Sequence, residues 1–216
     1  MKRKIKPLIK FIYHCLYTLG LWLIEVNHLY KNPKLCLFCI KAWFFQWHYT
    51  HSKKYLKDCE TTGLSKEELT YGETPISTLN KLLSSLKLSK DSQFLELGSG
   101  TGKTLYFIKK KFKIKTQGIE IIPGYQKWYQ KQKLNIKTDN FFNHSFKNAT
   151  ILYISDTCLS KKTLSRLNEK LNECTKNTLI ITMSWQIENQ NIQHLKTIKT
   201  PFYWGYGQLY IQKKIR

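Results

Sequence analysis

A glycine-rich turn at residues 96–102 is the part of the sequence best suited to binding a ligand. It follows a short apolar segment, precedes a run with helical spacing, and consists of Glu96, Leu97, Gly98, Ser99, Gly100, Thr101 and Gly102. Glycine lacks a Cβ atom, so the backbone can turn sharply and approach a ligand closely. Free N–H groups at the start of the next helix favour an anionic or polar group. Glu96 can accept hydrogen bonds from a ligand's ammonium group.

A second acidic residue, Glu120, ends the next predicted strand. A carboxylate at the carboxyl edge of the neighbouring strand is the usual partner of ribose hydroxyls in α/β nucleotide sites. The glycine spacing is G-x-G-x-G, whereas nicotinamide dinucleotide sites have G-x-G-x-x-G. We therefore expect Glu120 to bind the sugar of a nucleoside. The alternative is a solvated strand end or a helix cap.

A third polar turn follows the next short strand and contains Asp139 and Phe141. An acid or amide there can accept from an adenine amine, and an aromatic ring can stack on the base. The alternative is an ordinary turn with a buried pair of phenylalanines.

From about residue 74 onward, strand patterns alternate with helix patterns. We expect helices at 76–86, 104–112, 125–132 and 161–174, and strands at 93–97, 116–120, 134–137, 149–155, 178–184, 195–203 and 208–213. This alternation predicts an α/β fold, a Rossmann-like, doubly wound and mostly parallel sheet that ends in an antiparallel hairpin. Methyltransferases of class I share that architecture.

A P-loop is the competing interpretation of the glycine-rich turn. The turn continues into Lys103 and Thr104, which comes within one residue of G-x-x-x-x-G-K-[ST], and the strand at 149–155 leads to Asp156. However, Leu97 stands where the first glycine is required, and a P-loop gives no role to Glu96 and Glu120. We therefore prefer a nucleoside-containing cofactor and expect no metal.

The segment Thr70-Tyr71-Gly72-Glu73-Thr74-Pro75 resembles the Tyr-Gly-Glu-Thr loop of the disruptor-of-telomeric-silencing type of lysine methyltransferases. That family has, in the same order, a D-L-G-S-G-x-G turn, a Gly-Val-Glu, an acid-plus-phenylalanine turn and a hydrophobic strand after Asn-Thr. Matching segments here are 96–102, 118–120, 139–142 and 148–154. The resemblance covers residues 65–188.

The resemblance implies that S-adenosyl-L-methionine is the cofactor and that a protein lysine accepts the methyl group. The implied cofactor-binding residues are Glu73, Thr74, Glu96, Gly98, Ser99, Gly100, Gly102, Glu120, Asp139 and Phe141. We assign catalytic roles to Tyr71, which with Trp185 would wall the acceptor channel, and to Asp156, which would orient the amine or else only cap a strand. The family's Asn-Asn-Phe is replaced by Ser-Asp-Thr-Cys at 155–158, which argues against a histone.

Composition adds a strong positive charge. Lysine and arginine number 36 against 14 aspartates and glutamates, a net charge of +22. Such a surface attracts nucleic acid, anionic lipid or acidic proteins, but no nucleic-acid signature is present, so nucleic acid is not required. The six cysteines follow no disulfide framework, which favours a reducing, cytoplasmic location. Cys36-x-x-Cys39 with His48-x-x-His51 is too closely spaced for a usual zinc finger.

The N-terminal region, residues 1–48, is expected to be helical and hydrophobic. Phe11 to Val26 is apolar on all sides and follows a lysine-rich start, so it is either an anchor on the cytoplasmic face of a membrane or a cap packed on the catalytic domain. A cleaved signal peptide is a third alternative, but no clear small-x-small cleavage site follows. Residues 49–69 have the polar composition of a linker, and 70–216 would form the methyltransferase domain. A membrane-attached scaffold without turnover is a further alternative. The sequence leaves the oligomeric state open.

Overall fold

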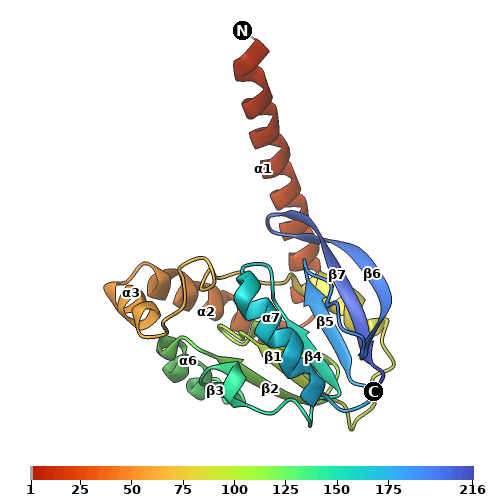
Figure 1. The fold of residues 1–216 in the computed structure, drawn as a ribbon. Helices are drawn as coiled ribbons and strands as arrows, with labels where there is room; N and C mark the ends of the chain where they lie inside the picture. The colour runs from red at the N-terminus through yellow and green to blue at the C-terminus, as the bar shows by residue number, and fades with distance from the viewer. Residues whose placement is uncertain (1) are drawn as a thin grey trace.

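The structure, a computed structural model, describes the backbone of residues 2–216 and the side chains of residues 13–216. Its strands form one seven-stranded sheet in the order β3-β2-β1-β4-β5-β7-β6 (Figure 1). The strands are β1 Gln93–Leu97, β2 Lys115–Glu120, β3 Ile136–Thr138, β4 Ile151–Ile154, β5 Leu179–Met183, β6 Ile192–Phe202 and β7 Gly205–Lys214. The first five are parallel, whereas β7 is antiparallel to β5 and β6. The expected α/β fold with a mostly parallel sheet is confirmed.

Helices pack on both faces of this sheet. The helices are α1 Lys2–Leu29, α2 Pro33–Thr50, α3 Lys53–Glu60, α4 Ile76–Ser84, α5 Lys103–Lys111, α6 Gln126–Lys131 and α7 Lys161–Lys170, with 3-10 turns at Pro123–Tyr125, Phe141–Asn143 and Leu171–Glu173. Residues of α4 and α5 share one apolar cluster with one face of the sheet, and residues of α7 share a second cluster with the other face. Figure 1 shows α7 crossing in front of β4.

The alternation of side chains along β1 explains why both faces need cover. Phe94 belongs to the cluster beneath α4 and α5, whereas Leu95 and Leu97 belong to the cluster beneath α7. Successive strand residues point to opposite faces, so a strand that is apolar on both must lie in the interior of a sheet. Accordingly β1 pairs with β2 on one side and with β4 on the other.

This position of β1 creates the crevice in which a ligand can bind. The chain runs from β1 outward to β2 and β3 and then returns to β4 on the opposite side of β1. In open α/β sheets, ligands bind outside the carboxyl ends of the strands at such a change of direction. The glycine-rich turn leaves β1 at that edge.

Residues 49–69, whose composition is typical of a linker, contain a helix in the structure. Helix α3 begins after Ser52, whose side chain accepts a hydrogen bond from Tyr55 N. The side chains of Tyr55 and Cys59 pack against an apolar cluster that contains Tyr125. Leu69, at the end of the segment, is buried in the same cluster. The segment therefore packs on the sheet domain, and our division at residues 48 and 69 remains a prediction.

The C-terminal half of α1 contacts the domain, while much of its apolar surface is exposed. Leu21 is buried, and the Tyr17 hydroxyl lies 2.8 Å from Phe202 O and 2.9 Å from Gly205 O. Exposed apolar side chains on this helix are Tyr13, Leu16, Leu19, Trp22, Leu23, Ile24 and Val26. Among the described residues, we find no helix with an apolar stretch long enough to cross a membrane. An association of this segment with a membrane surface stays a prediction.

Glu25 of α1 makes a buried contact with the sheet domain. Its carboxylate accepts hydrogen bonds from Ile76 N at 2.7 Å and from Ser77 N at 2.8 Å, in the first turn of α4. The residue before this helix, Pro75, offers no side-chain cap. A carboxylate at a helix N-terminus satisfies free N–H groups and complements the helix dipole. Glu25 therefore caps α4 from another part of the chain.

We predict that Glu25→Ala lowers the free energy of unfolding by about 2–3 kcal/mol, because two buried N–H groups lose a charged acceptor. Urea denaturation measures the change. Glu169→Ala, which removes an exposed glutamate from α7, is the control and should stay within about 0.5 kcal/mol of the wild type. Equal stability of the two variants would contradict the capping role.

Candidate functional site

A cavity of about 150 Å³ lies at the carboxyl edge of the sheet. Its lining comes from the loop before α4, the turn after β1, and the ends of β2 and β4. Of the predicted cofactor-binding residues it includes Glu73, Thr74, Glu96, Gly98, Ser99, Gly100, Glu120 and Phe141, together with the predicted catalytic residue Tyr71. The structure thus brings most of the predicted site together. Gly102 and Asp139 lie outside this lining.

The turn after β1 has the backbone conformation that its glycines permit. Gly98, Gly100 and Gly102 have φ angles of +78°, +50° and +76°. L side chains rarely adopt this left-handed region. A Cβ atom on Gly98 would meet no protein atom within 4 Å, whereas one on Gly100 would lie 2.6 Å from Cε2 of Tyr71. Gly98 therefore faces open space, and Gly100 makes room for the Tyr71 ring.

Glu120 holds the glycine-rich turn against β2. Its carboxylate accepts from Gly100 N at 2.7 Å and from Ile122 N at 2.9 Å. Burial raises the pKa of this carboxyl group above its usual value, and the two backbone donors oppose the shift. Each carboxylate oxygen has two lone pairs, so these two contacts leave acceptor capacity for ligand hydroxyls.

Glu96 is a buried acid in the cavity lining. It is 5% exposed, and its Oε2 atom is buried without a hydrogen-bond partner. Burial raises its pKa to about 8, and the neighbouring carboxylates of Glu120 and Glu73 add to the shift. A buried polar atom without a partner costs free energy, so this atom is ready to accept from a ligand donor.

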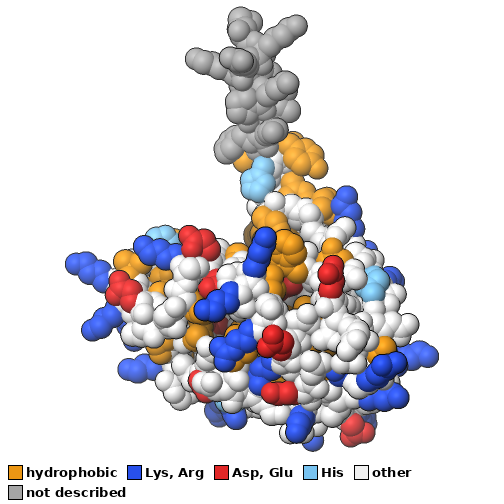
Figure 2. All heavy atoms as spheres, viewed as in Figure 1, with side chains coloured by type: hydrophobic (Ala, Val, Ile, Leu, Met, Phe, Trp, Pro, Cys, Tyr) orange, Lys and Arg blue, Asp and Glu red, His pale blue; other side chains and the backbone are white. Residues whose placement is uncertain are grey.

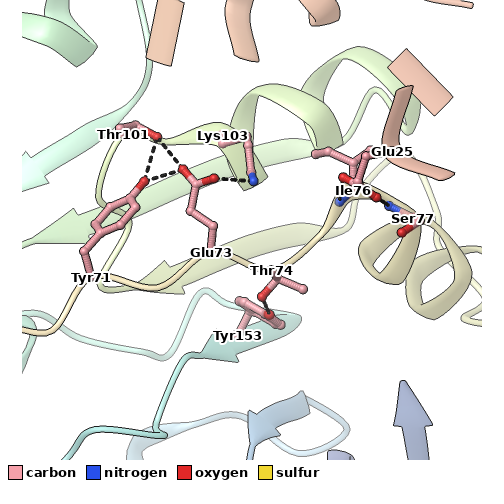
Figure 3. A network of polar contacts seen from close by, with 9 residues as sticks. All are labelled: Glu25, Tyr71, Glu73, Thr74, Ile76, Ser77, Thr101, Lys103 and Tyr153. Atoms are coloured by element: carbon pink, nitrogen blue, oxygen red, sulfur yellow. Dashed lines mark hydrogen bonds and ion pairs between the residues drawn. The ribbon is translucent and has the colours of Figure 1, made fainter. Parts of the chain in front are cut away.

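The loop at residues 71–74 lies over the glycine-rich turn and is fixed there by polar contacts (Figure 3). The Tyr71 hydroxyl donates to Glu73 Oε1 and lies 3.2 Å from Thr101 Oγ1. Lys103 Nζ donates to Glu73 Oε2. Burial alone would raise the pKa of Glu73, but the adjacent Lys103 ammonium lowers it below the usual value. Burial and the Glu73 carboxylate raise the pKa of Tyr71, so its hydroxyl stays protonated.

The polar turn after β3 lines the cavity with two phenylalanine rings and an asparagine, whereas its aspartate, Asp139, lies outside the lining. Asn140, Phe141 and Phe142 line the cavity. The Asp139 carboxylate accepts from Asn140 N at 2.7 Å and from Asn143 Nδ2 at 2.8 Å. Asp139 therefore shapes the turn, while the Oδ1 atom of Asn140 accepts from Phe142 N.

Asp156 lies beneath the edge of the cavity, outside its lining. It is fully buried, its Oδ1 atom accepts from Met183 N at 2.7 Å, and its Oδ2 atom has no partner. Burial raises its pKa to about 8. Ser155 lines the cavity instead, and Trp185 does not. The geometry fits a positioning role for Asp156 between β4 and β5, and a catalytic role stays a prediction.

Sequence reasoning missed two residues that shape the site. Lys103 was considered only as a P-loop lysine, but it pairs with Glu73 at the cavity wall. Trp128 Nε1 donates to Thr101 O at 2.9 Å and supports the turn from α6. The position of Lys103 just after the last glycine was a usable signal, whereas the Trp128 contact depends on tertiary packing.

Comparison with known proteins agrees with this geometry. The family model described as "Histone methylation protein DOT1" matches residues 56–138, which include the Tyr71 loop, the glycine-rich turn and Glu120. No protein of curated function matches the chain significantly.

Solved structures share the fold at low identity. An RNA methyltransferase from Salinibacter ruber, in complex with S-adenosyl-L-homocysteine, has a TM-score of 0.57 at 16% identity, with 67% of this chain and 94% of that chain covered. TrmN from Thermus thermophilus also has a TM-score of 0.57, at 7% identity, with 69% and 52% covered. A geranyl diphosphate methyltransferase in complex with S-adenosylmethionine has a TM-score of 0.52 at 9% identity, with 66% and 86% covered.

The sheet order and the cavity at its carboxyl edge are those of the fold that these S-adenosylmethionine-dependent methyltransferases share. Within this class, the chain resembles the disruptor-of-telomeric-silencing type over residues 56–138. The residues present fit S-adenosyl-L-methionine: Glu96 has an unpartnered oxygen for an ammonium group, Gly98 leaves open space, and Glu120 has acceptor capacity for ribose hydroxyls. The residues of this site are therefore suited to S-adenosyl-L-methionine as the cofactor.

We predict that Gly98→Ala weakens S-adenosylhomocysteine binding at least about tenfold, since a methyl group in the cavity displaces the ligand and forfeits its contacts. Isothermal titration calorimetry measures the Kd. Gly63→Ala is a matched control, because Gly63 has a φ of +68° and likewise no atom within 4 Å of a Cβ position. Both variants carry the same backbone strain, so an equal loss of affinity in both would argue against this placement of the ligand.

Proposed function

We propose that this protein transfers a methyl group from S-adenosyl-L-methionine to the side-chain amine of a lysine in another protein. The buried, unpartnered Oε2 atom of Glu96 beside the glycine-rich turn carries the cofactor half of the proposal. The family match across the Tyr71 loop supports a lysine acceptor. The solved structures that share the fold act, by their names, on RNA or on a small molecule, so the fold alone does not choose the acceptor.

In this proposal each cavity residue has a role set by its surroundings. Glu96 accepts from the cofactor's ammonium group, Glu120 accepts from the ribose hydroxyls, and Phe141 stacks on the adenine. Ser99, Gly100 and Gly102 shape the turn, while Glu73 and Thr74 hold the loop that covers the methionine end. Thr74 Oγ1 contacts the Tyr153 hydroxyl, which fixes the loop on β4 (Figure 3).

S-adenosylmethionine supplies, when bound, a methyl group activated by its sulfonium centre, so the chain's residues need only position the acceptor and exclude water. A lysine that has first lost its proton to solvent would accept this methyl group on its nitrogen, with the residues of the loop and the glycine-rich turn holding the cofactor beside it. Tyr71 stays protonated and walls the site. Asp156 acts in this scheme through the backbone of β5, which its Oδ1 atom holds.

A P-loop nucleotide site has less support. In P-loop proteins the lysine after the last glycine reaches the β- and γ-phosphates. Here the Lys103 ammonium is paired with Glu73, and this contact raises the pKa of Lys103 despite its burial. The order of the sheet and the family match also favour the methyltransferase.

We predict that cofactor binding near neutral pH releases almost one proton. The pKa of Glu96 is raised to about 8, so the carboxyl group is mostly protonated before binding, and a ligand ammonium favours the ionised form. Titration calorimetry in buffers of different ionisation enthalpy measures the release, which should decrease as the pH rises through about 8 and Glu96 ionises before binding.

Glu96→Gln should abolish this proton release and weaken binding. Asp156→Asn is the control: its pKa is also raised to about 8, but it lies outside the cavity lining, so the release should persist. Proton release that depends on Asp156 and not on Glu96 would contradict our placement of the ammonium group.

For the acceptor, we predict that methyl-labelled S-adenosylmethionine transfers its label to protein in a host lysate, and that digestion yields methyl-lysine. Heat-treated enzyme is the background control. Label in RNA or in small molecules would contradict the lysine acceptor. Tight cofactor binding without transfer to any fraction would favour the scaffold without turnover, and binding of magnesium-ATP in place of S-adenosylmethionine would favour the P-loop.

A further inference from the structure

A second cavity borders the cofactor cavity. It has a volume of about 1030 Å³ and lies between α1, α2 and the turn from β6 to β7. Four residues line both cavities: Tyr71, Gly72, Glu73 and Lys103. A molecule in the second cavity would therefore touch the same loop and ion pair that cover the predicted methionine end of the cofactor.

Exposed aromatic rings form the walls of the second cavity. Trp22 of α1, Trp43 and Phe44 of α2, and Trp204 of the β6–β7 turn are 57%, 62%, 59% and 47% exposed. Figure 2 shows hydrophobic side chains gathered where α1 meets the domain. Contiguous apolar surface of this kind in a folded protein marks an interaction site. Tryptophan is also the residue type that most often dominates binding energy in protein interfaces.

The α1 helix builds this cavity by holding two of its walls. Glu25 caps α4 and so fixes the end of the 71–74 loop, and the Tyr17 hydroxyl lies within hydrogen-bond distance of both Phe202 O and Gly205 O. The second contact fixes the turn that carries Trp204. Polar contacts from α1 therefore hold the loop on one side of the cavity and the turn with Trp204 on the other.

The charge of the cavity is opposite to that of the whole chain. Its lining contains two carboxylates, Glu25 and Glu73, against one lysine, Lys103, whereas the chain carries a net charge of +22. Aromatic faces attract cations, and tryptophan does so most strongly. A cationic side chain is thus attracted into the cavity, while a strongly basic segment around it is repelled by the rest of the surface.

We propose that this cavity is the docking site for the acceptor, and that the acceptor lysine lies in a protein segment with apolar neighbours and few other positive charges. This inference rests on the proposed function. The apolar neighbours pack on Trp43, Phe44 and Trp204, and the lysine side chain extends past Tyr71 and Glu73 toward the cofactor cavity. A histone-like basic tail does not fit, because it would meet the positive surface.

The test uses a short fluorescent peptide with one central lysine between leucine and phenylalanine residues, measured by anisotropy in the presence of S-adenosylhomocysteine. Trp43→Ala should weaken peptide binding at least about tenfold, the usual effect of losing an aromatic anchor. Trp47→Ala is the matched control, because Trp47 lies one turn further along α2, is 56% exposed and does not line the cavity. It should change the Kd less than about twofold.

Two altered peptides test the chemistry of recognition. Acetylation of the lysine should weaken binding, because the cation is lost, and arginine neighbours should weaken it most at low salt, where repulsion is strongest. Equal binding of the acetylated peptide would overturn the proposal, as would equal binding to wild type and Trp43→Ala. A loss confined to Trp185→Ala would place the acceptor at the other side of the loop and overturn it too.

The remaining outcomes separate this inference from the function on which it rests. If S-adenosylhomocysteine binds to all variants but no peptide does, the docking site is refuted and the cofactor site stands. If S-adenosylhomocysteine does not bind, the proposed function itself fails. Anionic lipid vesicles that bind through Trp43, with no binding of peptide, would identify the aromatic walls as a membrane surface and also refute the docking site.

Discussion

The ion pair between Glu73 and Lys103 joins the loop that covers the cavity to the helix that follows the glycine-rich turn. Glu73 comes from the loop before α4, and Lys103 is the first residue of α5. The Lys103 side chain is buried and the Glu73 side chain is partly buried, so their attraction is stronger than that between two fully exposed charges. Removing one partner would leave the other charge without compensation. The pair is therefore one of the contacts that hold the loop over the glycine-rich turn. The hydroxyls of Tyr71 and Thr101 add to the same contact.

A contact from the N-terminal helices fixes the other end of the loop at residues 71–74. The loop is held by Lys103 on one side and, through α4, by the Glu25 carboxylate on the other. The Glu25 carboxylate supplies a cap that the local sequence lacks, since the α4 N-terminus has no side-chain cap of its own. Glu25 therefore ties α1 to the sheet domain through a buried contact, while other apolar side chains of the same helix remain exposed.

Much of this arrangement follows from local sequence. Strand β1 was predicted at its observed bounds because an apolar run on both faces, followed by three alternating glycines, has few other interpretations. The polar composition of residues 49–69 gave no sign of α3, because a short helix packed by a few aromatic side chains has weak periodicity. The Tyr71 loop was found only through the family resemblance. The ion pair with Lys103 was not found, since it joins residues far apart in sequence.

The two buried acids show why residue type alone did not decide function. Asp156 and Glu96 both end or follow apolar strands, and burial raises the pKa of each to about 8. Both also have one oxygen without a partner. They differ in the direction from which a partner can come: Glu96 lines the cavity, whereas Asp156 is enclosed against β5. A perturbed pKa indicates a functional site only where the group can reach a ligand. Access, which the sequence does not encode locally, favours a binding role for Glu96 and a positioning role for Asp156, and both roles stay predictions.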